Sequence, residues 1–223
     1  MAQRPLFTLS PRLACIADYI PTGAALADVG SDHAYLPIHL LREGKIVRAI
    51  ASDISQPCIV RARANALRYR VPSSMLDVRL SDGLKNIAPD EVDTIVIAGM
   101  GGETIADILT AAPWVKQGKL LILHPASKAP HLRRWCMENG LGVVDERIVR
   151  EGHRLYPILV VRSDAPVRCD IRYTAASAPV WASNDEAAIE YLRRQRLYLS
   201  REQDNQAENA AIIAALDERL GNT

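Results

Sequence analysis

The chain has 223 residues, of which 48% are hydrophobic and 24% are charged, and its formal net charge is +1. This length suits one main domain with at most a small appendage, and the near-neutral charge excludes a protein that recruits polyanions through its overall field. No apolar run reaches the roughly 18 residues that a membrane-spanning helix needs, and the first residues lack a signal-peptide pattern. We therefore expect a cytoplasmic protein that has no membrane partner.

Short apolar segments alternate with amphipathic segments along the first two thirds of the chain. A helix is predicted over residues 10–20, with Ser10 as its cap and Pro11 in its first turn. The predicted strands are 25–29, 47–52, 76–80, 93–98 and 119–124, and the predicted helices that follow them are 34–43, 56–70, 101–112 and 130–139. This alternation predicts a parallel sheet of the doubly wound α/β class.

Two further strands are predicted close together, at 141–152 and 154–163. The Gly152-His153 link is too short for a crossover helix, so the two strands must be antiparallel. A mostly parallel sheet that ends in an antiparallel hairpin is typical of S-adenosylmethionine (SAM)-dependent methyltransferases, whose fold is Rossmann-like and of class I. It differs from the usual dinucleotide-binding sheet.

The last segment, residues 164–223, has a different character. It shows no clean period up to residue 182, and then Ser183 and Glu186 have the spacing of a capping box at the start of a helix. The polar run 204–209 lies between two apolar stripes, which predicts two antiparallel helices, with one long helix as the alternative. We therefore divide the chain into a methyltransferase domain, residues 1–163, and a C-terminal helical domain, residues 164–223.

The sequence LADVGSDHAYLP, residues 26–37, begins like a nucleotide-binding turn but has Asp32 where a dinucleotide-binding loop needs a glycine. A side chain with a negative charge at this position opposes a pyrophosphate. SAM has no phosphate, and carries an ammonium, a sulfonium and one carboxylate. Asp28 and Asp32 can face its cationic part, while the N–H groups after Gly30 and the next helix N-terminus can bind its carboxylate. The loop therefore favours SAM over NAD, although Asp32 could instead cap the helix.

Acidic residues also follow the second and third predicted strands. Asp53 comes 25 residues after Asp28 and can accept hydrogen bonds from ribose hydroxyls, although it could instead cap the next helix. Asp82 can accept a hydrogen bond from an adenine amine, beside a tight turn at Gly83. The fourth strand ends in glycines that suit either a close ligand or a flexible turn, namely Gly99, Gly101 and Gly102. All four strand ends share the carboxyl edge of the sheet, where ligands bind in open α/β folds.

The motifs LADVGSDHAYLP, ASDIS, LSDGL and DTIVIAGMGG, with the paired final strands, resemble the bacterial tRNA (adenine-22 N1)-methyltransferase family. The resemblance covers residues 8–163 and, weakly, the tail. It implies a seven-stranded Rossmann-like domain with a coiled-coil-like helical appendage, which transfers the methyl group of SAM to N1 of an adenine in the D-arm region of tRNA. The SAM-binding residues expected from the motifs and this resemblance are Asp28, Gly30, Ser31, Asp32, His33, Asp53, Ile54, Asp82, Gly83, Gly99, Met100 and Gly101.

The mechanism implied by the resemblance needs no base before attack, because N1 of adenine carries a free lone pair. A carboxylate would stabilise the cationic product, and Asp32 is the first candidate for this catalytic role, with Glu103 second. Tyr35 could stack on the target base or belong to the core. No metal is expected, because His33 has no second ligand at a suitable spacing. The chain has His124-Pro125-Ala126 where the family tends to have Gln-Pro-Asn, and His124 could serve the site or the core.

Basic residues gather in three places, where they could bind RNA phosphates or form solvated helix faces. They are Arg61, Arg63, Arg68 and Arg70; Lys128, Arg133, Arg134, Arg147, Arg150 and Arg154; and Arg193, Arg194 and Arg196. The resemblance, not the charge, implies tRNA as the substrate; DNA is not expected and a monomer is favoured. The alternatives are a SAM-dependent methyltransferase for another RNA, a small molecule or a protein, a non-catalytic SAM-fold RNA-binding protein, and an NAD oxidoreductase.

Overall fold

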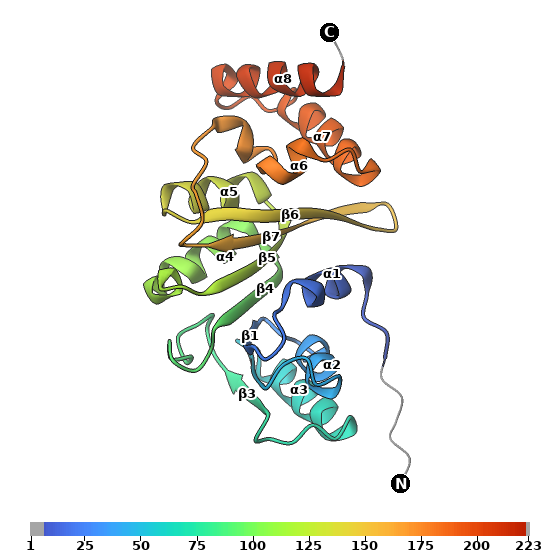
Figure 1. Cartoon of the computed structure of the whole chain (residues 1–223), viewed down its shortest axis with the longest axis vertical. Coiled ribbons are helices and arrows are strands. Elements are labelled where there is room, and N and C mark those ends of the chain that lie inside the picture. Colours follow the sequence, from blue (N-terminus) through green and yellow to red (C-terminus); the bar gives the residue numbers. More distant parts are fainter. Residues whose placement is uncertain (1–6, 222–223) are drawn as a thin grey trace.

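The computed structural model describes residues 7–221, and it contains a seven-stranded sheet in the order β3-β2-β1-β4-β5-β7-β6. The strands are β1 (Ala25–Val29), β2 (Arg48–Asp53), β3 (Leu76–Leu80), β4 (Thr94–Gly101), β5 (Leu120–Ser127), β6 (Gly142–Glu151) and β7 (Arg154–Arg162). The pairs among β1 to β5 are all parallel, and β7 pairs antiparallel with both β5 and β6. The predicted mixed sheet with an antiparallel final hairpin is thus confirmed (Figure 1).

The helices follow the strands as the alternation predicts. They are α1 (Pro11–Tyr19), α2 (Tyr35–Arg42), α3 (Gln56–Arg68), α4 (Gly102–Thr110), α5 (Ala129–Glu138), α6 (Ala178–Ala182), α7 (Glu186–Leu199) and α8 (Gln206–Leu220), with short 3-10 turns η1 (Pro113–Lys116) and η2 (Ile171–Thr174). Ser10 caps α1, since its side chain accepts a hydrogen bond from the N–H of Leu13, and Pro11 opens the helix.

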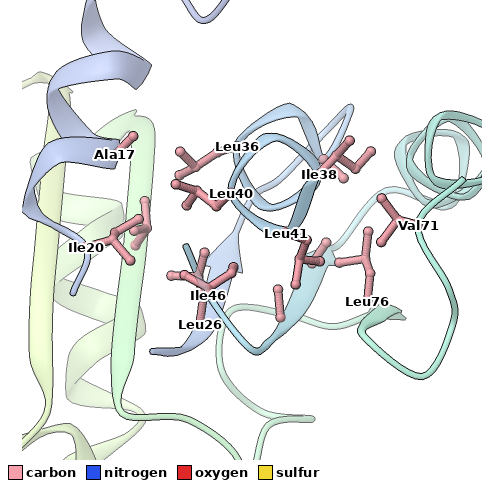
Figure 2. Close-up of a cluster of buried hydrophobic side chains, with 14 of the residues drawn as sticks. Ala17, Ile20, Leu26, Leu36, Ile38, Leu40, Leu41, Ile46, Val71 and Leu76 are labelled. Carbon is pink, nitrogen blue, oxygen red and sulfur yellow. The ribbon is translucent and has the colours of Figure 1, made fainter. Parts of the chain in front are cut away.

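Two hydrophobic cores lie on opposite faces of the sheet, which explains why the central strands are apolar at nearly every position. In β4, Val96 faces one core, and its neighbours Ile95 and Ile97 face the other. The first core packs α1, α2 and α3 on the sheet, and Figure 2 shows Ile20, Leu36 and Leu40 meeting Leu26 there. The second core packs α4 and α5 on the other face. The domain therefore has three layers with a parallel sheet buried in the middle.

The C-terminal helices form a third hydrophobic cluster against β6, at the far end of the molecule from α2 and α3 (Figure 1). Helices α7 and α8 are separate and pack against each other, so the alternative of one long helix is wrong. The predicted capping box is also wrong. Asp185 caps α7 by accepting hydrogen bonds from the N–H groups of Ala187 and Ala188 at 2.8 and 3.3 Å. A carboxylate placed next to the helix satisfies these donors, while Ser183 ends α6.

Candidate functional site

The loop after β1 is fixed to the end of β2. The N–H groups of Gly30 and Ser31 both donate to the carbonyl oxygen of Ser52, at 2.8 and 3.0 Å. Asp28 is buried below this loop and accepts a hydrogen bond from the Ser31 hydroxyl. Burial raises the pKa of Asp28 from 3.8 to about 6. The acid thus closes the loop from within, and the backbone above it remains at the carboxyl edge of the sheet.

Asp53 joins the β1 loop to β2 from the second strand end. One of its carboxylate oxygens accepts from the N–H of Asp32 at 3.2 Å and the other accepts from the N–H of Ser55 at 2.8 Å. Ser55, not Asp53, stands at the N-cap of α3, so a helix-capping role for Asp53 is wrong. Its carboxylate is held in one orientation beside Ile54, whose side chain is 70% exposed. Asp53 and Ile54 thus place an acidic and an apolar side chain next to each other at the end of β2.

Asp32 has a left-handed backbone, with φ of 45°, and its side chain is half-exposed. It pairs with Arg61 of α3 at 2.6 Å and with His33 at 3.3 Å, and the hydrogen bond from Arg61 lowers the pKa of Asp32. The N-cap of α2 is Ala34, which has no side-chain hydrogen bond, so the capping role considered for Asp32 is wrong. The ring of Tyr35 stacks on His33 at 5.2 Å and is 37% exposed, so Tyr35 is not a core residue.

The ends of β3 and β4 complete this edge of the sheet. The N–H of Ser81 donates to the carbonyl of Asp53, which brings Asp82 beside the second strand end. Asp82 is exposed and pairs with Lys85 at 2.5 Å, and Gly83 has φ of 58°, as the predicted tight turn requires. The end of β4 is irregular at Gly99, Met100 and Gly101, which we call the β4 loop, and Gly99 has φ of 82°. The ends of these four neighbouring parallel strands therefore lie at one edge of the sheet, and we refer to residues 28–33, 53–54, 82–83 and 99–101 as the cradle.

Gly30 and Gly102 each lack room for a side chain, because a different neighbour lies against each of them. A Cβ on Gly30 would lie 2.2 Å from Cε of Met100, so this glycine lets the β1 loop and the β4 loop touch. A Cβ on Gly102 would lie 2.2 Å from the carbonyl oxygen of Lys128. Gly102 is therefore needed for packing of α4 against the start of α5, and the expectation that it leaves room for a ligand is wrong.

A cleft of about 1080 Å³ adjoins the cradle and lies between the sheet edge and the C-terminal helices. One wall consists of Gly99, Glu103 and residues 125–131, and the opposite wall belongs to α7, the 200–205 link and α8. The cleft reaches the cradle only at the β4 loop, because Gly99 belongs to both. Asp32 and Asp53 do not line it.

Arg12 and Tyr156 line this cleft and were not identified from the sequence. The Arg12 guanidinium lies 4.5 Å from the centre of the Tyr156 ring and pairs with Glu151 at 2.5 Å. It also reaches Nε2 of His124 at 3.5 Å. The three partners come from β5, β6 and β7, more than 100 positions away in the sequence, so no local pattern connects them to Arg12.

His124 is buried behind the cleft wall, with 1% of its surface exposed. Its Nδ1 lies 3.2 Å from the carbonyl oxygen of Pro157 and its Nε2 faces Arg12. A carbonyl only accepts and a guanidinium only donates, so the proton is on Nδ1. Burial lowers the pKa of His124 to about 4. His124 is therefore a neutral residue that positions Arg12 and the end of β5.

Most of the clustered basic residues have structural partners. Arg133 is fully buried with Glu146, and Arg134, Arg150 and Arg196 pair with acids of the C-terminal helices. The expectation that Arg133 is available to RNA is therefore wrong, since its charge is used inside the protein. Lys128 and Arg154, which line the cleft, are exposed and make no ion pair within residues 7–221.

Residues 7–221 lack two further kinds of feature. No three His, Cys, Asp or Glu side chains of this part gather as metal ligands would. None of its helices combines the length and the hydrophobicity required to span a bilayer.

The chain is similar to known methyltransferases in sequence and in structure. Residues 9–159 match the family described as a methyltransferase domain. The tRNA (adenine(22)-N(1))-methyltransferase of Bacillus subtilis is 41% identical over 156 residues, which cover 70% of this chain and 65% of that protein. The match thus spans slightly less than two thirds of the relative's length.

Solved structures extend the likeness over nearly the whole chain. A Streptococcus pneumoniae protein, named as a candidate tRNA (m1A22) methyltransferase and crystallised with S-adenosyl-L-methionine, is 31% identical with a TM-score of 0.85, covering 96% of this chain and 100% of that chain. The B. subtilis m1A22 tRNA methyltransferase is 29% identical with a TM-score of 0.80, covering 96% of both chains. With 96% of the chain covered, these matches include C-terminal helices.

Proposed function

The chain belongs to the methyltransferase-domain family, among the tRNA (adenine-22 N1)-methyltransferases, and from this premise we propose that it transfers a methyl group from SAM to N1 of adenine 22 in tRNA. The observation that carries the proposal is that Gly99 belongs both to the acidic edge of the sheet and to the wall of the cleft. An acid-lined cradle lies on one side of Gly99, and a cleft large enough for a nucleotide lies on the other.

The cradle fits SAM in its chemistry. Acidic side chains stand at three successive strand ends. The N-terminus of α2 follows the β1 loop, whose own N–H groups at Gly30, Ser31 and Asp32 are already engaged by Ser52 and Asp53. In the proposed assignment, the loop residues Gly30, Ser31, Asp32 and His33 hold the amino-acid part above Asp28. Asp53 and Ile54 hold the ribose and one face of the adenine, and Asp82 and Gly83 hold the adenine edge. Gly99, Met100 and Gly101 border the methyl group.

Bound SAM supplies a methyl group on a positively charged sulfur. The protein must place N1 of the target adenine about 3 Å from that methyl and in line with the sulfur. The close approach of Gly102 to the Lys128 carbonyl fixes α4 against the cleft wall. The target base has to leave its stack to reach Gly99, so the cleft takes an unstacked nucleotide.

The remaining assignments follow from the same proposal. Residues 1–163 act as the SAM-binding domain and residues 164–223 as a helical domain that forms the second wall of the cleft. The partner is tRNA, not DNA or a membrane, the place of action is the cytoplasm, and the protein works as a monomer. Lys128 and Arg154 are exposed cations at the cleft that make no ion pair within residues 7–221, so they can bind RNA phosphates.

The proposal is tested by methyl transfer from labelled SAM to two transcripts of one tRNA, with adenine or guanine at position 22. We expect label on the adenine transcript alone. Label on neither transcript, from a protein that binds SAM, would refute tRNA as the acceptor and favour another RNA or a small molecule. A thermal shift with NAD but none with SAM would refute the cofactor assignment.

A further inference from the structure

Glu103 lies in the first turn of α4, on the wall of the cleft that adjoins the cradle. Gly99 lines the same wall, and Met100 between them contacts Gly30 of the β1 loop. The β4 loop is therefore the one place where the cradle and the cleft share residues, and the Glu103 carboxylate belongs to its cleft side. A base that enters the cleft to meet the cradle must pass this side chain.

Some carboxylates that line the cleft already bind another side chain of the protein, and others do not. Glu208 pairs with Arg134, and Glu202 accepts a hydrogen bond from the Tyr198 hydroxyl. Asp204 belongs to the opposite wall, in the link between α7 and α8. Glu103 makes no ion pair or side-chain hydrogen bond within residues 7–221, and its side chain is exposed. It is thus the unengaged carboxylate on the wall nearest the cradle.

Asp32 is a poorer candidate for a role at the target base. Its carboxylate is held by Arg61 at 2.6 Å and by His33 at 3.3 Å, on the α3 side of the loop. It does not line the cleft. The charge of Asp32 is therefore balanced inside the cradle, away from the space that receives the base.

Methylation moves a positive charge from one reactant to the other. The lone pair of N1 forms the new N1–C bond, the C–S bond breaks, and its electron pair stays on sulfur. The sulfonium becomes a neutral thioether and the adenine becomes a cation, so no proton has to move. A carboxylate on the base side of the β4 loop stabilises the charge where it develops.

We propose that Glu103 is the catalytic carboxylate that stabilises the positive charge on the target adenine during methyl transfer. This inference rests on the proposed function and adds a residue to it. Since Glu103 is an anion in a cleft that also accepts phosphates, it opposes substrate binding while it favours the reaction. Removing its charge therefore has opposite effects on binding and on rate.

The test compares Glu103→Gln with the wild-type protein in single-turnover methyl transfer at saturating SAM and tRNA. The rate constant should fall by about 10- to 100-fold, since loss of one electrostatic contact to a transition state has effects of this order. The Kd for SAM should stay within about twofold, and the Kd for tRNA should be unchanged or lower. Glu103→Asp, which keeps the charge on a shorter chain, should recover part of the rate.

Glu138→Gln provides the matched control, because Glu138 is an exposed carboxylate at the end of α5 and outside the cleft. It should behave as the wild type does. An unchanged rate for Glu103→Gln, or a loss of rate that comes with equal losses in SAM binding and thermal stability, would overturn the role of Glu103. An active wild type with an equally active Glu103→Gln would overturn only this inference, whereas an inactive wild type would overturn the proposed function as well.

Discussion

Arg133 provides the strongest test of how the C-terminal helices are held against the sheet. Its guanidinium donates to both carboxylate oxygens of Glu146, at 2.5 and 3.2 Å, and to the Tyr191 hydroxyl at 2.9 Å. It also donates to the carbonyl oxygens of Thr174 and Ala175 at 3.1 and 2.9 Å. One buried side chain of α5 thus ties together β6, η2 and α7.

Arg133→Met should leave Glu146 as a buried carboxylate with one remaining donor, the N–H of Ser177 at 2.9 Å. Breaking a buried ion pair in this way costs about 3–5 kcal/mol of unfolding free energy. For a chain of this size, about 2–4 °C per kcal/mol gives a fall in Tm of about 6–20 °C. Urea and thermal unfolding followed by circular dichroism measure both quantities.

Arg134→Met is the control, because the neighbouring arginine of the same helix forms a half-exposed pair with Glu208 and should cost less than about 1 kcal/mol. The double variant Arg133→Met with Glu146→Leu should recover at least half of the loss, since no buried charge remains. If Arg133→Met cost no more than Arg134→Met, Arg133 would not hold the C-terminal helices in place.

Two further predictions concern the start of α4 and the buried acid below the cradle. Gly102→Ala should lower stability by about 1–3 kcal/mol through overpacking against the Lys128 carbonyl, and should slow methyl transfer by displacing α4, whereas Gly101→Ala, with a 3.5 Å contact, should cost less than about 1 kcal/mol; equal losses in urea unfolding would disprove the packing argument. Because burial raises the pKa of Asp28 from 3.8 to about 6, the stability contributed by this group is present below its usual pKa and is lost as pH rises through about 6. The unfolding free energy of Asp28→Asn should therefore rise by about 3 kcal/mol relative to that of the wild type as pH goes from about 3.5 to about 7. A difference in unfolding free energy that does not change with pH would contradict this.

The sheet and its order of elements could be predicted from the sequence because the signal is local. The segment 93–98 is apolar on both faces of its strand, and the structure buries Ile95, Val96 and Ile97 between two helical layers. The Gly152-His153 link could only join antiparallel neighbours, and β6 and β7 pair in that way. Such features need no knowledge of distant residues.

The cleft and its surroundings could not be predicted, because they depend on contacts between distant segments. Arg12 meets His124 and Tyr156 only after the sheet forms, and the second wall depends on where α7 and α8 dock. Arg133 looked like part of a basic surface because its neighbours are basic, yet its partner Glu146 stands 13 positions away on β6. Likewise, Arg61 lies 29 positions from Asp32, so the sequence did not show that the Asp32 carboxylate is already paired. This pairing is one reason why we assign the catalytic role to Glu103.

The most direct test of the proposed activity is reverse transcription of a tRNA after reaction with the protein and SAM. A methyl group on N1 blocks the Watson–Crick edge of adenine, so a primer extended from the 3′ end should stop one nucleotide before adenine 22, and only when SAM is present. The account predicts this single new stop, absent from the guanine-22 transcript. Full-length extension of a transcript that has taken up label would show methylation at another atom, and would contradict the assignment of N1.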